Sequence, residues 1–185
     1  MNLRTFRIGG VHPEENKITA EMATQVAPLP KQAIFPLGQH IGAPAQPIVS
    51  KGDQVLVGQK VAEAGGFVSA NIFSSVSGTV KAIEPRMTPA GAKVNSIVIE
   101  NDGEFKEAAF EAKPYDQMSK DDVLAAIKEA GIVGLGGAGF PTHVKLAPKD
   151  PDAIEYIIVN GAECEPYITG CLLYTSDAAD DLTRV

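Results

Sequence analysis

A dense run of glycines late in the chain has the composition of a phosphate-binding loop. Residues 131–146 contain Gly134, Gly136, Gly137 and Gly139. Glycine allows the backbone to approach a ligand closely and to adopt positive φ angles. Pro141 follows and suits the start of a helix, whose free amide groups attract phosphate, while Lys145 can add a positive charge. The pattern predicts a phosphate-binding loop rather than glycines that merely mark a turn.

The same glycines also fit the Gly-x-Gly-x-x-Gly pattern of an ordinary Rossmann dinucleotide-binding turn, which by itself is a weak signal. A Rossmann turn follows a β-strand. Here the preceding residues predict a helix, which Ser119 can cap and Gly131 can end. We therefore keep the ordinary Rossmann dehydrogenase only as an alternative.

A second group of polar residues follows a predicted buried strand at residues 154–160, which are rich in β-branched side chains. In open α/β sheets the ligand crevice lies at the carboxyl ends of the strands. The amide and carboxylates there could accept hydrogen bonds from ring N–H or ribose hydroxyl groups. The simpler interpretation is a solvated acidic turn. The residues concerned are Asn160, Glu163 and Glu165.

Short apolar runs separated by turn residues predict an all-β domain over residues 33–103. Their order resembles the barrel-sandwich hybrid of lipoyl and biotinyl domains, which attach a cofactor to a lysine at a hairpin tip. The corresponding tip, residues 63–69, has no lysine, so a structural or docking role is favoured. Within this domain we predict tight turns at Lys51-Gly-Asp53 and Ser77-Gly78, and a strand at residues 96–99.

The remaining segments are interpreted as connections. Residues 1–32 predict an irregular arm with at most one strand, and residues 104–118 a linker. His40 is expected to bond to nearby backbone rather than to act as a functional group. The fold class is thus α+β or α/β: an all-β barrel-sandwich hybrid followed by the start of an α/β domain.

The composition excludes several kinds of protein. A formal net charge of -7 argues against binding to nucleic acid through its phosphates. Two cysteines make no disulfide framework and favour a reducing, cytoplasmic compartment. We find no apolar run of membrane-spanning length and no signal peptide in this sequence.

The combined motifs resemble a known family. The glycine loop with Asn160-Gly-Ala-Glu-Cys-Glu-Pro166 is similar to the flavin-binding subunits of respiratory NADH dehydrogenases. Together with Gly10-Val-His-Pro13 and Gln39-His-Ile-Gly-Ala-Pro44, these motifs resemble the RnfC (RsxC) member of the Rnf (Rsx) ion-translocating electron-transport complex. The resemblance implies a peripheral subunit on the cytoplasmic face of the membrane. It implies electron transfer between NADH and ferredoxin, coupled to sodium or proton movement, with ferredoxin and the other subunits as partners.

The resemblance also implies cofactors and site residues. FMN would be held by Gly134, Gly136, Gly137, Ala138, Gly139, Lys145, Asn160, Glu163 and Cys164. Phe140 and Glu165 would face NADH. The cofactor performs the hydride transfer and the protein orients the rings, so no residue of the chain is assigned a catalytic role.

The chain departs from the family after Thr169. Residues 171–185 look like a foreign, disordered tail, so residues 119–170 would be a truncated FMN/NADH domain. Cys171 is then no cluster ligand, and Cys164 alone cannot hold a 4Fe-4S cluster, which we expect only in a further C-terminal part. We expect the isolated chain to bind FMN weakly and to be inactive. A non-catalytic docking module of a multisubunit complex remains an alternative.

Overall fold

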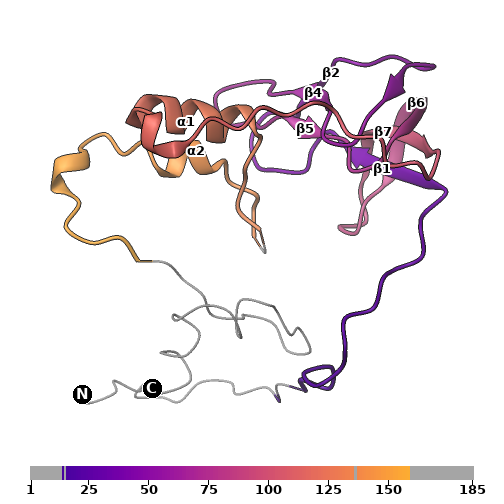
Figure 1. Ribbon diagram of the computed structural model, residues 1–185, viewed down its shortest axis with the longest axis horizontal. Coiled ribbons are helices and arrows are strands. Elements are labelled where there is room, and N and C mark those ends of the chain that lie inside the picture. Colours follow the sequence, from indigo (N-terminus) through magenta and orange to yellow (C-terminus); the bar gives the residue numbers. More distant parts are fainter. Residues whose placement is uncertain (1–13, 15, 136, 159–185) are drawn as a thin grey trace. The chain divides into compact units, whose positions relative to one another are not determined.

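The computed structural model describes most of the chain, namely residue 14, residues 16–135 and residues 137–158. The chain divides into two units, each described by itself. One unit is Pro28–Pro151, which contains all strands and both α-helices of the described residues (Figure 1). The other unit combines Met1–Ala27 with Asp152–Val185. In the described part of the N-terminal arm we find turns, and a strand begins only at its last residue, Gln32.

Among the described residues, seven antiparallel strands form two sheets, with the orders β1-β7-β6-β3 and β2-β4-β5. One cluster of buried apolar side chains draws on both sheets, including Ile97 of β7 and Val61 of β4. The predicted all-β barrel-sandwich hybrid is confirmed. The strands are Gln32–Pro36 (β1), Gln46–Pro47 (β2), Gln54–Val55 (β3), Lys60–Glu63 (β4), Ile72–Phe73 (β5), Gly78–Met87 (β6) and Lys93–Asn101 (β7).

Strand β7 is central to this core. It lies between β1 and β6, and Ile97, Val98 and Ile99 are fully buried. β-branched side chains favour strands because they pack well on a pleated surface. The strand predicted at residues 96–99 is confirmed and extends further in both directions.

Two features of the barrel differ from prediction. Strand β5 was missed because it has only two residues, too few to show a strand pattern. The tight turn predicted at Ser77-Gly78 is wrong, since Gly78 begins β6 and pairs with Val55 and Asn101. Gly78 has φ +150°, and a Cβ added there would lie 1.9 Å from the Glu100 carbonyl oxygen. This glycine therefore permits the close approach of two strands and does not reverse the chain. The other predicted turn is confirmed, with Gly52 at φ +98°.

The segment predicted as a linker is attached to the barrel where it begins. Val57 forms a parallel bridge with Glu107, donates its N–H to Lys106 O (2.8 Å) and accepts from Ala108 N–H (2.8 Å). Further on, the short 3-10 helix η1 covers Tyr115–Gln117. The charged side chains of this segment gave no sign of the pairing with Val57, because that pairing uses only backbone atoms.

Helix α1, Lys120–Glu129, begins and ends as predicted. Ser119 Oγ accepts from Asp122 N–H (3.2 Å), and Asp122 Oδ2 accepts from Ser119 N–H (3.0 Å), which completes a capping box. At the other end Gly131 adopts φ +65°. Hydrogen bonds from Ser119, then the charge of Lys113, lower the pKa of the Asp122 carboxyl below its usual value.

Substituting Ser119→Ala is expected to reduce the free energy of unfolding by about 1 kcal/mol, because the Asp122 N–H loses Ser119 Oγ as its acceptor at the helix start. Urea unfolding followed by circular dichroism measures the change, with Ser75→Ala at an exposed serine as control. The lowered pKa of Asp122 determines how its contribution to stability depends on pH. Its contribution is complete above the unfolded pKa of about 4 and is lost as the pH falls through the lower folded pKa. An unchanged stability in Ser119→Ala would contradict the capping role.

The buried strand predicted at residues 154–160 is wrong for the residues that the structure describes. Residues 151–153 form the 3-10 helix η2, Pro151–Ala153, and residues 154–158 have no regular structure. Ile157 and Ile158 are 87% and 89% exposed. A buried strand needs neighbouring strands for its backbone and cover for its side chains. Among the described residues none pairs with this segment.

Candidate functional site

The glycine loop lies between two helices and is closed at its base. Val133 and Pro141 form an antiparallel bridge, Gly134 N–H donates to Phe140 O (2.9 Å), and Thr142 N–H donates to Ile132 O (2.9 Å). Helix α1 precedes the loop and helix α2, Thr142–Lys145, follows it; the two helices lie side by side (Figure 1). A helix rather than a strand leads into the loop. This context does not support the ordinary Rossmann turn.

Lys145 lies over the start of the loop. A Cβ added at Gly134 would be 2.7 Å from Lys145 Nζ, so the absence of a side chain at Gly134 makes room for this cation. At Gly137 an added Cβ would meet nothing within 4 Å. Bare backbone and a positive charge therefore meet on one side of the loop. That arrangement fits an anionic group such as a phosphate.

Helix α2 is short and differs from the prediction at its start. It has a single turn, and the buried Pro141 precedes it as its N-cap instead of lying in its first turn. A one-turn helix has a small dipole because few peptide units align. The positive charge at the loop thus comes chiefly from Lys145, not from the helix end.

The barrel also contacts the loop. Ile41 N–H donates to Ala138 O (2.8 Å). A Cβ at Gly139, which has φ +66°, would lie 3.0 Å from the Gln39 carbonyl oxygen. Gly139 therefore allows the loop to pack closely against the segment before β2. A glycine is needed at position 139 because the barrel lies so close, a requirement that the sequence alone did not reveal.

His40 confirms the expectation of a histidine bonded to backbone. Its Nε2 accepts from Ala70 N–H (3.2 Å), and its Nδ1 lies 3.1 Å from Ile41 O. Because Nε2 accepts, the hydrogen is on Nδ1, which donates to Ile41 O. The ring joins two segments of the barrel.

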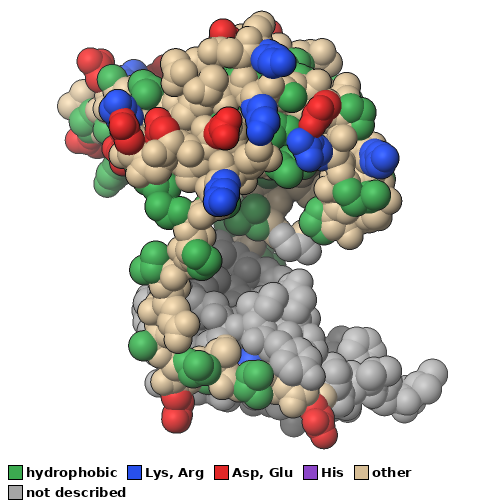
Figure 2. All heavy atoms as spheres, turned by 90° about the vertical axis from the view of Figure 1, so that its right-hand side faces the viewer, with side chains coloured by type: hydrophobic (Ala, Val, Ile, Leu, Met, Phe, Trp, Pro, Cys, Tyr) green, Lys and Arg blue, Asp and Glu red, His purple; other side chains and the backbone are tan. Residues whose placement is uncertain are grey.

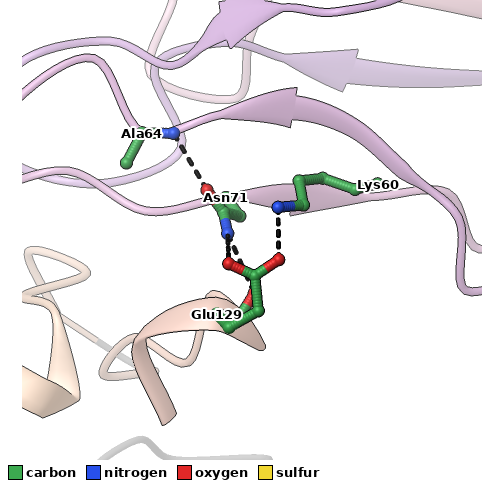
Figure 3. Close-up of polar contacts among 4 residues, drawn as sticks. All are labelled: Lys60, Ala64, Asn71 and Glu129. Atoms are coloured by element: carbon green, nitrogen blue, oxygen red, sulfur yellow. Dashed lines mark hydrogen bonds and ion pairs between the residues drawn. The ribbon is translucent and has the colours of Figure 1, made fainter. Parts of the chain in front are cut away.

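Helix α1 also contacts the barrel, through Glu129 (Figure 3). Its carboxylate pairs with Lys60 Nζ and accepts from Asn71 Nδ2 (3.3 Å), which also donates to the Glu129 carbonyl (2.9 Å). Asn71 Oδ1 accepts from Ala64 N–H (3.0 Å). Sequence reasoning missed these residues, and no local signal could have revealed them, since Asn71 and Glu129 are 58 positions apart.

His143 of helix α2 lies in surroundings that disfavour its charged form. Burial, then the nearby charge of Lys128, lowers the pKa of His143 below its usual value.

Figure 2 shows one face of the molecule on which acidic and basic side chains are interspersed rather than gathered into a basic patch. In the described part of the chain no three His, Cys, Asp or Glu residues are placed to hold a metal ion. None of the helices described there is long and apolar enough to cross a membrane.

The structure brings together six of the eleven predicted site residues. They share the loop and the helix that follows it: Gly134, Gly137, Ala138, Gly139, Phe140 and Lys145. The others lie outside the described residues: Gly136, Asn160, Glu163, Cys164 and Glu165.

Comparison with known proteins agrees with this architecture. Residues 5–104 match the family model described as the RnfC barrel sandwich hybrid domain. The chain belongs to the RnfC family. Residues 127–181, which include the glycine loop, match the Nuo51 FMN-binding domain. This second match extends past residue 170, the predicted end of the flavin domain.

Similar curated proteins carry names of the same kind. The chain is 48% identical to the C subunit of the proton-translocating ferredoxin:NAD(+) oxidoreductase complex of Clostridium ljungdahlii, over 90% of the chain and 37% of that protein. It is 47% identical to the Na(+)-translocating counterpart of Acetobacterium woodii, over 91% and 39%. It is 43% identical to the C subunit of the ion-translocating oxidoreductase complex of Rhodobacter capsulatus, over 90% and 33%. This RnfC-family chain therefore spans less than two fifths of the length of these relatives.

Proposed function

We propose that this chain is part of a peripheral electron-transfer subunit that passes electrons between NADH and ferredoxin through FMN and iron–sulfur clusters. The complex would couple this transfer to ion translocation, as the relatives' names state for those proteins. The chain would supply the barrel and the first part of the FMN site. The class is therefore an ion-translocating oxidoreductase, active as a complex, and the isolated chain would be inactive.

The observation that carries the proposal is the position of Lys145 Nζ over the bare backbone of Gly134. It lies within the segment that matches an FMN-binding domain. The fit to FMN is good on two counts, since a phosphate needs a cation and close backbone, and the open side of Gly137 leaves room for a ligand. Gly136 and Ala138 belong to the same loop and would contribute backbone to it.

The remaining roles follow the family resemblance. Asn160, Glu163 and Cys164 would line the flavin, while Phe140 and Glu165 would orient NADH. The bound FMN would supply a hydride acceptor for NADH and a carrier that can release single electrons. The residues of this chain would hold the phosphate, orient the two rings and keep them in register.

The iron–sulfur clusters would be held by a further part of the subunit. The other subunits and ferredoxin would be its partners, at the cytoplasmic face of the membrane. A docking module without catalytic function is less well supported. Docking to partner subunits alone would not require the barrel to contact the glycine loop through Ile41 and Gly139.

The test uses a chimera in which residues 1–170 of this chain are joined to the remaining part of the Clostridium ljungdahlii protein. Lys145→Met is expected to weaken FMN binding roughly tenfold or more, because a charge-assisted contact to the phosphate is lost. Fluorescence titration of FMN measures the dissociation constant. Riboflavin, which lacks the phosphate, should bind the two forms equally.

Lys149→Met is the matched control, since Lys149 is an exposed lysine four positions beyond α2. It should leave FMN affinity unchanged. Equal affinity of Lys145→Met and the unsubstituted chimera would remove the assigned role of Lys145. A chimera that binds no FMN at all would contradict the proposed function. The 185-residue chain alone should lose FMN during purification.

A further inference from the structure

The segment at residues 39–44 lies between the hairpin tip of the barrel and the glycine loop. On the tip side, Ala43 N–H donates to Val68 O (3.0 Å), and a Cβ at Gly42 would lie 2.1 Å from the same oxygen. On the loop side, Ile41 N–H donates to Ala138 O (2.8 Å). The hairpin tip, which carries a cofactor in lipoyl-like domains, is here packed against residues 39–44, and these residues in turn contact the glycine loop.

The His40 ring ties this segment to the strand that follows the tip. It accepts from Ala70 N–H through Nε2 (3.2 Å) and donates to Ile41 O through Nδ1 (3.1 Å). Ile41 is the residue that holds Ala138, and Ala70 is adjacent to Asn71. The ring therefore connects the two places where the barrel contacts the site.

Asn71 holds the end of helix α1. The last carbonyl groups of a helix have no partner within it. Asn71 Nδ2 donates a hydrogen bond to one of them, Glu129 O (2.9 Å), while Asn71 Oδ1 accepts from Ala64 N–H (3.0 Å) (Figure 3). Two residues later Gly131 passes so close that an added Cβ would lie 2.3 Å from Asn71 O. The barrel thus holds the end of the helix and the start of the loop in place.

We propose that the barrel-sandwich domain is the frame that keeps the glycine loop in its ligand-binding shape, with His40 and Asn71 as positioning residues. The loop is held at its entrance by Asn71 and at its far side by Ile41, which His40 orients. This role goes beyond the docking role predicted for the barrel. It rests on the proposed function only for the identity of the ligand.

The Lys60–Glu129 ion pair contributes less than the Asn71 contacts. The Glu129 side chain is 66% exposed, and exposed ion pairs are weakened by water and salt. Asn71 bonds the backbone on both sides and does not depend on charge. The test therefore changes Asn71 and leaves the ion pair in place.

Asn71→Asp keeps the acceptor for Ala64 N–H but replaces the donor with a carboxylate that faces Glu129. In the 185-residue chain, without ligand, we expect the amide hydrogens of Gly134, Ile41 and Thr142 to exchange with solvent about tenfold faster. The reason is that residue 71 no longer donates to Glu129 O, so the start of the loop is no longer held on the barrel. Amide exchange measured by NMR gives these rates. His40→Phe keeps a ring and removes both polar contacts, so it should act in the same direction.

Asn101→Asp is the matched control on another part of the barrel. Asn101 also uses both ends of its amide, with Nδ2 donating to Pro30 O (3.0 Å) and Oδ1 accepting from Gly103 N–H (2.9 Å). It should leave exchange in the loop unchanged. Slow exchange of the Ile97 and Ile99 amides in every variant verifies that the barrel is folded. Unchanged loop exchange in both Asn71→Asp and His40→Phe, or equal acceleration in Asn101→Asp, would overturn the proposal.

A second measurement separates this inference from the proposed function. In the chimera, Asn71→Asp should weaken FMN binding about tenfold and raise loop exchange together, whereas Lys145→Met should weaken binding without changing exchange. Faster exchange with unchanged FMN affinity would overturn the positioning role. If the unsubstituted chimera binds no FMN, the proposed function fails, while the ligand-free exchange rates still decide whether the barrel holds the loop.

Discussion

Replacing Gly131 with alanine is expected to reduce the free energy of unfolding by about 2–5 kcal/mol. Gly131 has φ +65°, which costs a residue with a side chain about 1–2 kcal/mol. Its added Cβ would also lie 2.3 Å from the Asn71 carbonyl oxygen, and overpacking costs about 1–3 kcal/mol more. Because the obstructing atom belongs to backbone, relief requires that helix α1 move away from the barrel. Urea unfolding followed by circular dichroism measures the loss.

The control for Gly131→Ala is Gly91→Ala. Gly91 has a similar φ of +77°, but a Cβ there would meet nothing within 4 Å. It should therefore cost only the backbone part, about 1–2 kcal/mol. If the two substitutions cost the same, the close packing of α1 on the barrel does not contribute to stability. In the chimera Gly131→Ala should also weaken FMN binding, since the loop begins at this residue.

A larger effect is expected from Gly78→Ala in the barrel. A Cβ at this position would lie 1.9 Å from Glu100 O and 2.9 Å from the carbonyl carbon, so β6 and β7 would have to separate where Gly78 pairs with Asn101. We expect a loss of about 4 kcal/mol or more, which is a large part of the stability of a small domain. Circular dichroism and amide exchange of β7 would show a barrel that is partly or wholly unfolded.

Gly38→Ala serves as the control for Gly78→Ala. An added Cβ at Gly38 would touch only Val94 Cγ1 at 3.5 Å, an ordinary contact. Its stability should change by less than about 1 kcal/mol. A folded Gly78→Ala barrel with native stability would mean that the two strands can part at this point without loss.

The exposed segment after η2 shows how far a local pattern can mislead. Its β-branched residues have the composition of a buried strand, yet Ile157 and Ile158 are almost fully exposed. Strand propensity describes how well a side chain fits a half-buried sheet, and it creates neither the sheet nor its cover. The neighbouring strands that this segment would need are not among the described residues.

Several features of the fold and of the site followed from short-range sequence patterns. The capping box of α1, the positive φ of Gly131 and the turn at Gly52 each depend on residues close together in the chain. The closeness of Lys145 to Gly134 was also predictable, because a turn of helix after the loop brings the lysine back toward its start. The barrel-sandwich fold was recognisable from the spacing of its short apolar runs and from the motifs shared with the RnfC family.

The sequence by itself determined the barrel-sandwich architecture, the helix before the glycine loop and the lysine beside it, because each follows from local patterns or from a specific set of motifs. Only the tertiary structure decided what holds the loop. His40 meets Ala70 across 30 positions, and Asn71 meets Glu129 across 58. Such contacts depend on the backbone surfaces that two separately folded elements present to each other, and no spacing in the sequence encodes which carbonyl will face which amide.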